Sequence, residues 1–412
     1  MITVEEHRAD IDAAVEPLAP RRFALAECHG LVLAEDVTAQ LAVPPFDNSA
    51  MDGYAVRRAD LAGARPESPV RLPVVADVPA GVRAEQELPP GRAMRIMTGA
   101  PMPLGADAVV AVEDTDQPLG AAAAPTEVAI FHQPAPARHI RRAGEDIDVG
   151  AAVLARGEPL RGIHISAAAS VGRGELLAHP RPRIGVLATG DEIRPPGSPL
   201  GPGQIPDSNT SLLTGLLREA GAEPVTLPAA GDDPQRFEEL LAASARDLDG
   251  LVTSGGVSVG AFDVVKTTLG EGRGVAFRNV AMQPGKPQGF GLLDGALPVF
   301  CLPGNPVSVM VSFEVFVRPA LLRMAGRAPD PAPVPAVAAE GWGCPLGRRQ
   351  YIPVRIDDGP GGPPRVRPAS GGGSGSHLVA SLAGAQGLAV VAAEVEAVAA
   401  GDAVALIDMR SR

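Results

Sequence analysis

A glycine- and serine-rich stretch at residues 253–260 carries the clearest chemistry in the chain. It follows a short apolar run at 250–252, which predicts a buried strand, and it precedes a predicted helix at 264–269. Backbone N–H groups of such a turn can approach an anion closely, and the start of a helix adds its positive end. Asp263 and Lys266 would place a carboxylate and an ammonium beside that anion. The stretch therefore indicates a site for an oxyanion or a metal-bridged phosphate, although a turn without a ligand has the same pattern.

Three further apolar runs end in loops of the same kind. The runs at 184–188, 224–227 and 297–302 lead into polar loops at 189–192, 231–234 and 303–306. Because the loops that follow parallel strands gather at one edge of an open α/β sheet, where ligands bind, we expect all four loops to converge. Carboxylates and phosphate-cradling glycines would then share one site.

The elements that must position these loops alternate between strand and helix from about residue 183 to residue 323. Helices are expected at 208–220, 234–246, 263–269 and 306–324. Asp207 offers an N-cap for the first, and Pro306 suits the first position of the last. This alternation predicts a doubly wound α/β domain.

A β domain is predicted ahead of it, because short alternating runs at 72–76, 93–97, 108–112 and 127–130 are divided by Gly and Pro. Residues 43–55 are too polar for a core strand and too apolar for a plain linker, and one interpretation is a loop with an Asp-Gly turn that crosses between domains. Residues 138–147 combine three arginines with two acids, a pattern that is more often a solvated face than a site.

Both ends of the chain complete the organisation. Helix is expected over much of residues 1–43, including 24–33, and again at 160–178. A proline-rich linker at 329–335 leads to a small β domain with strands at 351–356, 388–391 and 403–407, whose Gly/Ser loop at 370–376 is a flexible tether or, alternatively, an anion cradle. The predicted domains are a helical part at 1–43 plus 147–180, a β domain at 44–146, an α/β domain at 181–326 and a terminal β domain at 330–412.

Composition limits the class of protein. A chain of 412 residues suits two to four domains, and its 48 glycines and 43 prolines indicate many turns. The net charge of −12 argues against a nucleic-acid or membrane-surface binder, so an anionic ligand requires a locally positive pocket. Three distant cysteines form neither a disulfide framework nor a zinc spacing. The N-terminus does not resemble a signal peptide, and no apolar run is long enough to span a bilayer, so we expect a cytoplasmic protein.

Seven motifs in one order resemble the molybdopterin molybdenumtransferase family, the MoeA type that includes the E domain of gephyrin. They lie at residues 45–55, 95–100, 141–146, 189–192, 254–260, 284–287 and 302–308. Each motif alone is weak, whereas seven in the order of the family are highly specific. The resemblance covers the chain from about residue 45 to residue 308, and the terminal domain fits in outline.

The resemblance implies an elongated multidomain chain with an N-terminal helical part, an inserted β domain, a molybdopterin-binding α/β domain and a C-terminal β-barrel-like domain. It implies a homodimer whose active site is shared between subunits. The reaction that it implies is insertion of molybdate into adenylylated molybdopterin, with release of AMP. Transient docking with a molybdopterin adenylyltransferase and with recipient apo-molybdoenzymes would accompany such a role.

The resemblance also implies residue roles. Asp263, Glu192 and Asp232 could share a Mg²⁺ that polarises the phosphoryl group. Asp52 and Asp146 resemble the acidic residues of the inserted β domain, where a carboxylic acid could protonate a molybdate oxo group. The residues expected to bind substrate are Thr98, Thr189, Ser254, Gly255, Gly256, Ser258, Lys266, Lys286, Pro303, Gly304, Asn305, Arg348 and Ser376.

Two departures and two alternatives remain at this point. Ala261 and Phe262 replace the more polar residues that are common before Asp263. Gln283 stands where most relatives have Lys, which removes a cation from the expected oxyanion pocket. A molybdopterin adenylyltransferase uses a related α/β domain, but residues 44–54 and the preceding β domain speak against that activity. An interaction scaffold like the gephyrin E domain would have no use for the acidic loops.

Overall fold

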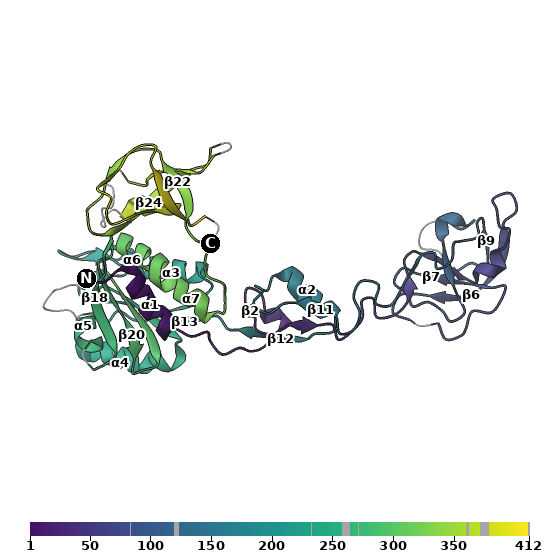
Figure 1. Ribbon diagram of the computed structural model, residues 1–412. Helices are drawn as coiled ribbons and strands as arrows, with labels where there is room; N and C mark the ends of the chain where they lie inside the picture. Colours follow the sequence, from purple (N-terminus) through teal and green to yellow (C-terminus); the bar gives the residue numbers. More distant parts are fainter. Residues whose placement is uncertain are drawn as a thin grey trace. The chain divides into compact units, whose positions relative to one another are not determined.

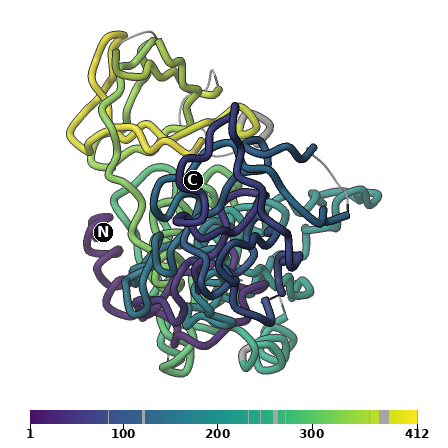
Figure 2. Tube along the Cα trace, turned by 90° about the vertical axis from the view of Figure 1, so that its right-hand side faces the viewer, coloured from purple at the N-terminus to yellow at the C-terminus, as the bar shows by residue number. Residues whose placement is uncertain are grey.

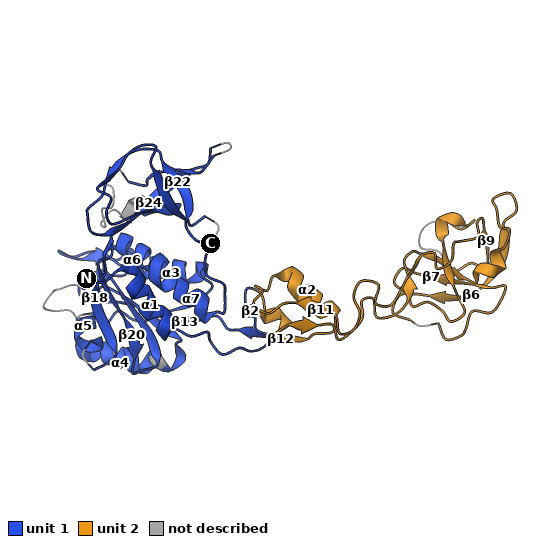
Figure 3. Cartoon of the chain, in the orientation of Figure 1, with its two compact units in different colours: residues 1–22, 30–34, 177–412 blue, residues 23–29, 35–176 orange. Residues whose placement is uncertain are grey.

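The chain folds into two compact units, which Figure 3 colours separately. One unit holds residues 1–22, 30–34 and 177–412, and the other holds residues 23–29 and 35–176. The computed structural model describes residues 1–82, 84–118, 123–231, 233–257, 264–270, 272–359, 362–370 and 379–410. Each unit is described by itself below.

A six-stranded mixed sheet forms the centre of the first unit, in the order β16-β13-β17-β21-β20-β18 (Figure 1). Its strands are β13 Arg183–Ala188, β16 Glu223–Thr226, β17 Gly250–Ser254, β18 Val275–Asn279, β20 Pro287–Leu293 and β21 Leu297–Leu302. The four strands predicted from sequence, β13, β16, β17 and β21, are confirmed and run parallel to one another. The antiparallel pair β18 and β20 was not predicted, because proline and two glycines interrupt the apolar pattern of β20.

Helices cover both faces of this sheet. They are α1 Val4–Ala14, α3 Ser208–Glu219, α4 Pro234–Ser244, α5 Val264–Leu269, α6 Pro306–Ser312 and α7 Arg318–Met324. A π-helical turn at Phe313–Val317 joins α6 to α7, so the predicted helix at 306–324 is confirmed as one continuous segment. Pro319 follows that turn and has no N–H to donate to the carbonyl four residues earlier, which fits a locally widened helix.

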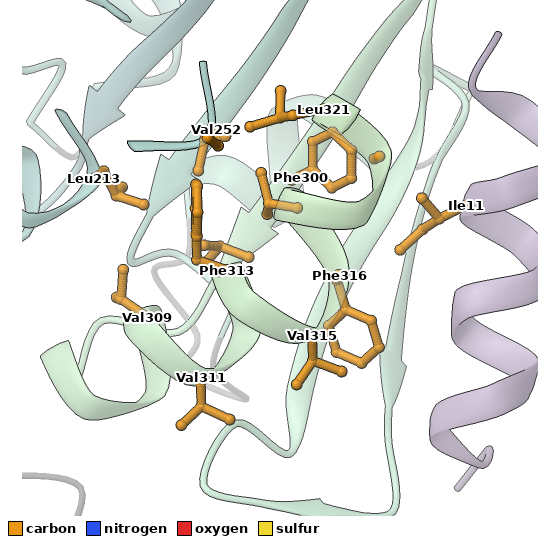
Figure 4. Close-up of a cluster of buried hydrophobic side chains, with 14 of the residues drawn as sticks. Ile11, Leu213, Val252, Phe300, Val309, Val311, Phe313, Val315, Phe316 and Leu321 are labelled. Atoms are coloured by element: carbon orange, nitrogen blue, oxygen red, sulfur yellow. The ribbon is translucent and has the colours of Figure 1, made fainter. Parts of the chain in front are cut away.

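The larger core of the unit lies between the sheet and the helices α1, α3, α6 and α7. Figure 4 shows Phe300 of the sheet among Phe313, Phe316 and Leu321, with Ile11 of α1 nearby. A second cluster fills the opposite face with side chains of α4 and α5, including Phe237 and Leu269. The sheet is thus buried on both faces.

Helix accounts for less of the N-terminal part than the sequence predicted. Besides α1, residues 21–38 form the short strands β1 Arg21–Ala24, β2 Val32–Leu33 and β3 Val37–Thr38, so the helix expected at 24–33 is wrong. Gly30 adopts a φ of 79°, which favours a turn over a helix at this point. The helix expected at 160–178 is only α2 Gly162–Ser170, because Gly172 turns the chain with a φ of 88° into the strand β12 Glu175–His179.

The second unit contains a five-stranded sheet in the order β8-β5-β7-β6-β9. Its strands are β5 Gly53–Val56, β6 Val70–Val78, β7 Ala93–Ile96, β8 Ala108–Ala111 and β9 Glu127–Ile130, and a bridge from Thr115 to Ile130 closes it into a barrel. Four of the strands were predicted. The interpretation of residues 43–55 as a loop is wrong at its end, because β5 is buried between β7 and β8. Gly53 permits this, since a Cβ there would lie 2.0 Å from the carbonyl oxygen of Val110.

The C-terminal part of the first unit forms its own closed sheet, coloured light green to yellow in Figure 2. Its strands are β22 Val334–Ala338, β24 Arg349–Asp357, β25 Arg365–Pro368, β26 Gly387–Val391 and β28 Ala403–Asp408, and pairing of β24 with β26 completes a barrel. The expected β-barrel-like domain is confirmed. The two-residue strand β19 Met282–Gln283, which belongs to the α/β domain, pairs in parallel with β24 at the edge of this sheet. Across the described ranges, no helix combines the length and apolar character that a membrane span requires.

Candidate active site

The loops that follow β13, β17 and β21 meet at one edge of the α/β sheet, which confirms the predicted convergence for three of the four loops. Ala188 at the end of β13 pairs with Ser254, and Ser254 pairs with Leu302 at the end of β21. Beyond the strands, the amide of Thr189 donates to the carbonyl of Ser254 at 3.3 Å, and the amide of Gly255 donates to that of Leu302 at 3.1 Å. The predicted substrate residues Thr189, Ser254, Gly255 and Gly304 are therefore brought together.

Asn209, in the first turn of α3, ties the loop after β17 to the loop after β21. Its Nδ2 donates to Ser254 Oγ at 2.7 Å and to the carbonyl oxygen of Gly304 at 2.6 Å. Its Oδ1 is buried and has no hydrogen-bond partner within the described part of the chain. In the sequence this residue stands out only as a possible helix cap beside Asp207, and not as part of a site. In the structure Asp207 is the cap, where it accepts from the amide of Thr210 at 2.9 Å, and Asn209 lies two residues later.

The glycine turn after β17 requires residues without a side chain. Gly255 has a φ of 94° and Gly256 a φ of 73°, in the left-handed region that favours glycine. A Cβ on Gly255 would lie 3.1 Å from both the carbonyl oxygen and Oγ1 of Thr189. Since its own amide is already bonded to Leu302, Gly255 shapes the turn rather than donating to an anion, which corrects one of the predicted donors.

The remaining predicted residues of this edge fall into two groups. Asn305 precedes α6, but its side chain does not cap that helix, while Pro303 is buried and Lys266 is exposed on α5. Glu192 folds over Gly190, where a Cβ would lie 2.5 Å from its Oε2. The other predicted residues, Asp232, Ser258, Asp263 and Ser376, lie outside the described residues.

Two cations lie at the loop between β19 and β20. Lys286 belongs to this loop, and its carbonyl oxygen accepts from the amide of Val280 at 2.7 Å. Pairing of β19 with β24 brings the terminal domain beside the same loop, where Arg348 Nη1 donates to Gln283 Oε1 at 3.4 Å. The position that lacks the family's lysine is therefore next to a guanidinium from the neighbouring domain.

A separate candidate site lies in the second unit. Asp52 and Thr98 line a cavity of about 540 Å³ together with Tyr54, Arg95 and Glu113. Asp52 Oδ1 accepts from the amide of Thr98 at 2.7 Å and from Thr98 Oγ1 at 2.7 Å. These hydrogen bonds favour the ionised carboxylate and hold the pKa of Asp52 below its usual value. An ionised carboxylate accepts protons, so Asp52 fits a fixed negative group better than the proton donor that the sequence suggested.

The charge cluster at residues 138–147 surrounds a different carboxylate. Asp47 accepts from the amide of Ala143 at 2.8 Å and pairs with the guanidinium of Arg142; the Arg142 side chain is exposed and that of Asp47 is partly exposed. The amide hydrogen bond and the Arg142 pair together lower the pKa of Asp47. Asp146 is also exposed, and its amide donates to the carbonyl of Val43 at 2.9 Å. This arrangement agrees with a solvated face.

Comparison with known proteins identifies the family. Residues 2–172 match the model for the MoeA N-terminal region (domain I and II), residues 185–323 a probable molybdopterin binding domain, and residues 335–409 the MoeA C-terminal region (domain IV). The chain belongs to the MoeA family of molybdopterin molybdenumtransferases. It is therefore similar to enzymes of molybdenum cofactor biosynthesis over nearly its whole length.

Individual relatives, found by sequence and by structure, agree with this family assignment. Molybdopterin molybdenumtransferase 2 of Mycobacterium tuberculosis (strain ATCC 25618 / H37Rv) is 44% identical and is matched over 99% of this chain and 100% of its own length. The Haemophilus influenzae molybdopterin molybdenumtransferase is 37% identical over 79% of this chain and 78% of its own. A solved structure of a molybdopterin biosynthesis MoeA protein from Pyrococcus horikosii superposes with a TM-score of 0.79, at 31% identity and 99% coverage of both chains.

For this MoeA-family chain, Thr98→Val is expected to raise the pKa of Asp52, because it removes one of the donors that favour the ionised carboxylate. Titration of ¹³C-labelled aspartate carboxyl groups by NMR measures the shift, with Asp52→Asn assigning the signal. Because the folded-state pKa lies below the unfolded one, the stabilising contribution of Asp52 is complete above the unfolded pKa. It is lost as the pH falls from the unfolded pKa through the folded pKa, so in the variant the loss should be smaller and should be complete at a higher pH.

Thr115→Val provides a matched control in the same unit. The Thr115 hydroxyl donates to the carbonyl oxygen of Val112 at 2.7 Å and not to a carboxylate, so its loss should leave the pKa of Asp52 unchanged. An unshifted Asp52 titration in Thr98→Val would contradict the role of the Thr98 hydroxyl.

Proposed function

We propose that the chain inserts molybdate into adenylylated molybdopterin and releases AMP in a Mg²⁺-dependent reaction. The observation that carries this proposal is the convergence of three strand-end loops, two of them joined by Asn209, at the edge of a sheet whose domain matches a probable molybdopterin binding domain. Such an edge is where open α/β sheets bind phosphate-containing ligands. Curated relatives that are 44% and 37% identical over 99% and 79% of this chain are named molybdopterin molybdenumtransferase.

The chain has a net charge of −12, so an anionic substrate would need nearby positive side chains to offset the repulsion. Lys286 would act as a compact point charge, and Arg348 would offer the planar fork that suits an oxyanion. Their neighbourhood at the β19–β20 loop supports a shared role toward molybdate or phosphate. Lys266 would add a third positive group on the helix after the glycine turn.

The proposed Mg²⁺ site consists of Glu192, Asp232 and Asp263. Glu192 is its one described member, and it supplies an oxygen donor at the loop after β13, as Mg²⁺ requires. No group of three or more acidic, histidine or cysteine side chains that could hold a metal lies within the described ranges. Bound Mg²⁺ would neutralise charge on the phosphoryl oxygens.

Release of AMP tests the function directly. Purified protein incubated with adenylylated molybdopterin should release AMP only when molybdate and Mg²⁺ are both present, as measured by chromatography. Release without molybdate, or no release at all, would overturn the proposal. Formation of adenylylated molybdopterin from ATP would instead identify an adenylyltransferase, and a scaffold would show neither reaction.

Glu192→Gln is expected to raise the Mg²⁺ concentration for half-maximal AMP release by about ten-fold, because the amide binds a hard cation more weakly than a carboxylate does. Mg²⁺ titrations of the rate measure this. Glu223→Gln serves as the control, since Glu223 forms an exposed pair with Arg183 at 3.3 Å. An unchanged Mg²⁺ requirement in Glu192→Gln would remove Glu192 from the metal site.

The proposed assembly is a homodimer whose active site is shared between subunits. This proposal is supported by the distribution of the candidate residues, because Asp52 and Thr98 belong to one compact unit and Asn209, Lys286 and Arg348 to the other. A two-fold dimer would form two composite sites. We further propose a cytoplasmic location and transient docking with a molybdopterin adenylyltransferase and recipient apo-molybdoenzymes.

A further inference from the structure

The loop at residues 284–286, between β19 and β20, is called the Lys286 loop below. A buried side-chain amide packs against it and has no role in the site described so far. Gln288, in β20, is only 1% exposed. Its Nε2 donates to the carbonyl oxygen of Gly285 at 2.6 Å and to Ser312 Oγ at 2.7 Å. Ser312 is fully buried at the end of α6, so the amide links the loop to the core of the α/β domain.

The loop is fixed from two directions. On one side, Gly285 adopts a φ of 96°, and a Cβ there would lie 2.9 Å from Ser312 Oγ and 3.2 Å from Gln288 Nε2. On the other side, the carbonyl oxygen of Lys286 accepts from the amide of Val280 at 2.7 Å. The backbone around Lys286 is thus held by the buried side chain of Gln288 on one side and by the amide of Val280 on the other.

Such fixation matters for a residue that must neutralise an anion. The lysine side chain is long and rotamer-rich, so a defined backbone is what limits the places its ammonium can reach. Electrostatic attraction falls with distance, and a misplacement of about 1 Å can cost much of the effect. A loop without its buried anchor would hold the ammonium less well against molybdate or phosphate.

We propose that Gln288 and Ser312 are positioning residues, which act on the bound oxyanion through the Lys286 loop without touching it. The proposal rests on the proposed function for the role of Lys286. Its alternative is a purely structural role, in which the buried amide contributes only to folding. The two differ in whether the effect of Gln288 disappears when the lysine side chain is already absent.

A double-mutant cycle between Gln288→Leu and Lys286→Ala separates the two roles. Binding of inorganic molybdate is measured by calorimetry, KM for molybdate and kcat by AMP release, and stability by urea unfolding. Gln288→Leu is expected to weaken molybdate binding by about ten-fold, the effect of one hydrogen-bonded anchor, and to raise KM more than it lowers kcat. In the Lys286→Ala background the same change should weaken binding no further.

Equal weakening in both backgrounds, or lower stability with unchanged molybdate affinity, would overturn the proposal. Should Gln288→Leu fail to fold, Ser312→Ala removes only the hydroxyl of the anchor and is expected to weaken molybdate binding by about two- to five-fold, again only when Lys286 is present. Gln386→Leu is the control, because it also loses a side-chain hydrogen bond, to the amide of Ile356 at 2.8 Å, but in the terminal sheet. Its molybdate affinity should equal that of the wild type.

Failure of this proposal is distinguishable from failure of the proposed function. If the wild-type protein releases no AMP, the molybdenumtransferase proposal fails, whereas calorimetry with molybdate or inorganic phosphate still reports on the loop. If AMP is released normally but the cycle is additive, only the positioning role is lost.

Discussion

Refolding Asp52→Asn chains together with Lys286→Ala chains is expected to restore roughly a quarter of wild-type AMP release, although each variant alone should be inactive. Asp52 belongs to one compact unit and Lys286 to the other. If the site is shared between subunits, a mixed dimer has one site with both lesions and one site with neither. Random pairing makes about half of the dimers mixed, and half of their sites are intact.

A matched mixture provides the control for this experiment. Gly255→Val and Lys286→Ala both alter the first unit, so every composite site in their mixed dimers carries one lesion. That mixture should stay inactive. If the Asp52→Asn and Lys286→Ala mixture also stays inactive, with mixed dimers verified by mass, each site is built within one chain and the shared-site proposal is wrong.

Gly255→Val is expected to lower kcat/KM for AMP release by about a hundred-fold or more, because it displaces the loops that meet at the sheet edge. A β-branched residue at a φ of 94° is strained, and its Cβ would lie 3.1 Å from two atoms of Thr189. The turn after β17 and the loop after β13 would therefore have to move apart. Steady-state kinetics measure the loss, and unfolding in urea measures the accompanying change in stability.

Gly203→Val separates backbone strain from the loss of geometry. Gly203 has a φ of 76°, and a Cβ there would meet no atom within 4 Å. It should therefore lose stability through strain and keep a kcat/KM within about two-fold of the wild type. Equal catalytic losses in the two variants would show that Gly255 has no special place at the site.

Local sequence patterns were sufficient to predict the four parallel strands of the α/β sheet and the edge at which their following loops lie. The apolar runs that became β13, β16, β17 and β21 are short, continuous and bounded by turn residues, which is how strands buried on both faces read. Parallel pairing then places their following loops at one edge without further information. A buried strand was not recognised where polar residues precede it, as in β5, or where glycine and proline interrupt it, as in β20, because its burial depends on neighbours that the local sequence does not contain.

By itself, the sequence determined the four parallel strands of the α/β sheet with their glycine turn, the β domain before them and the ordered motifs of the MoeA family. Only the tertiary structure decided which polar side chains hold the site together. Asn209 reaches a carbonyl 95 positions away, and Thr98 fixes the carboxylate of Asp52 from 46 positions away. Gln288 likewise finds its second partner on a separate helix. A hydrogen bond is set by the separation of two atoms in space, and for residues so distant along the chain that separation is created only when the whole domain packs.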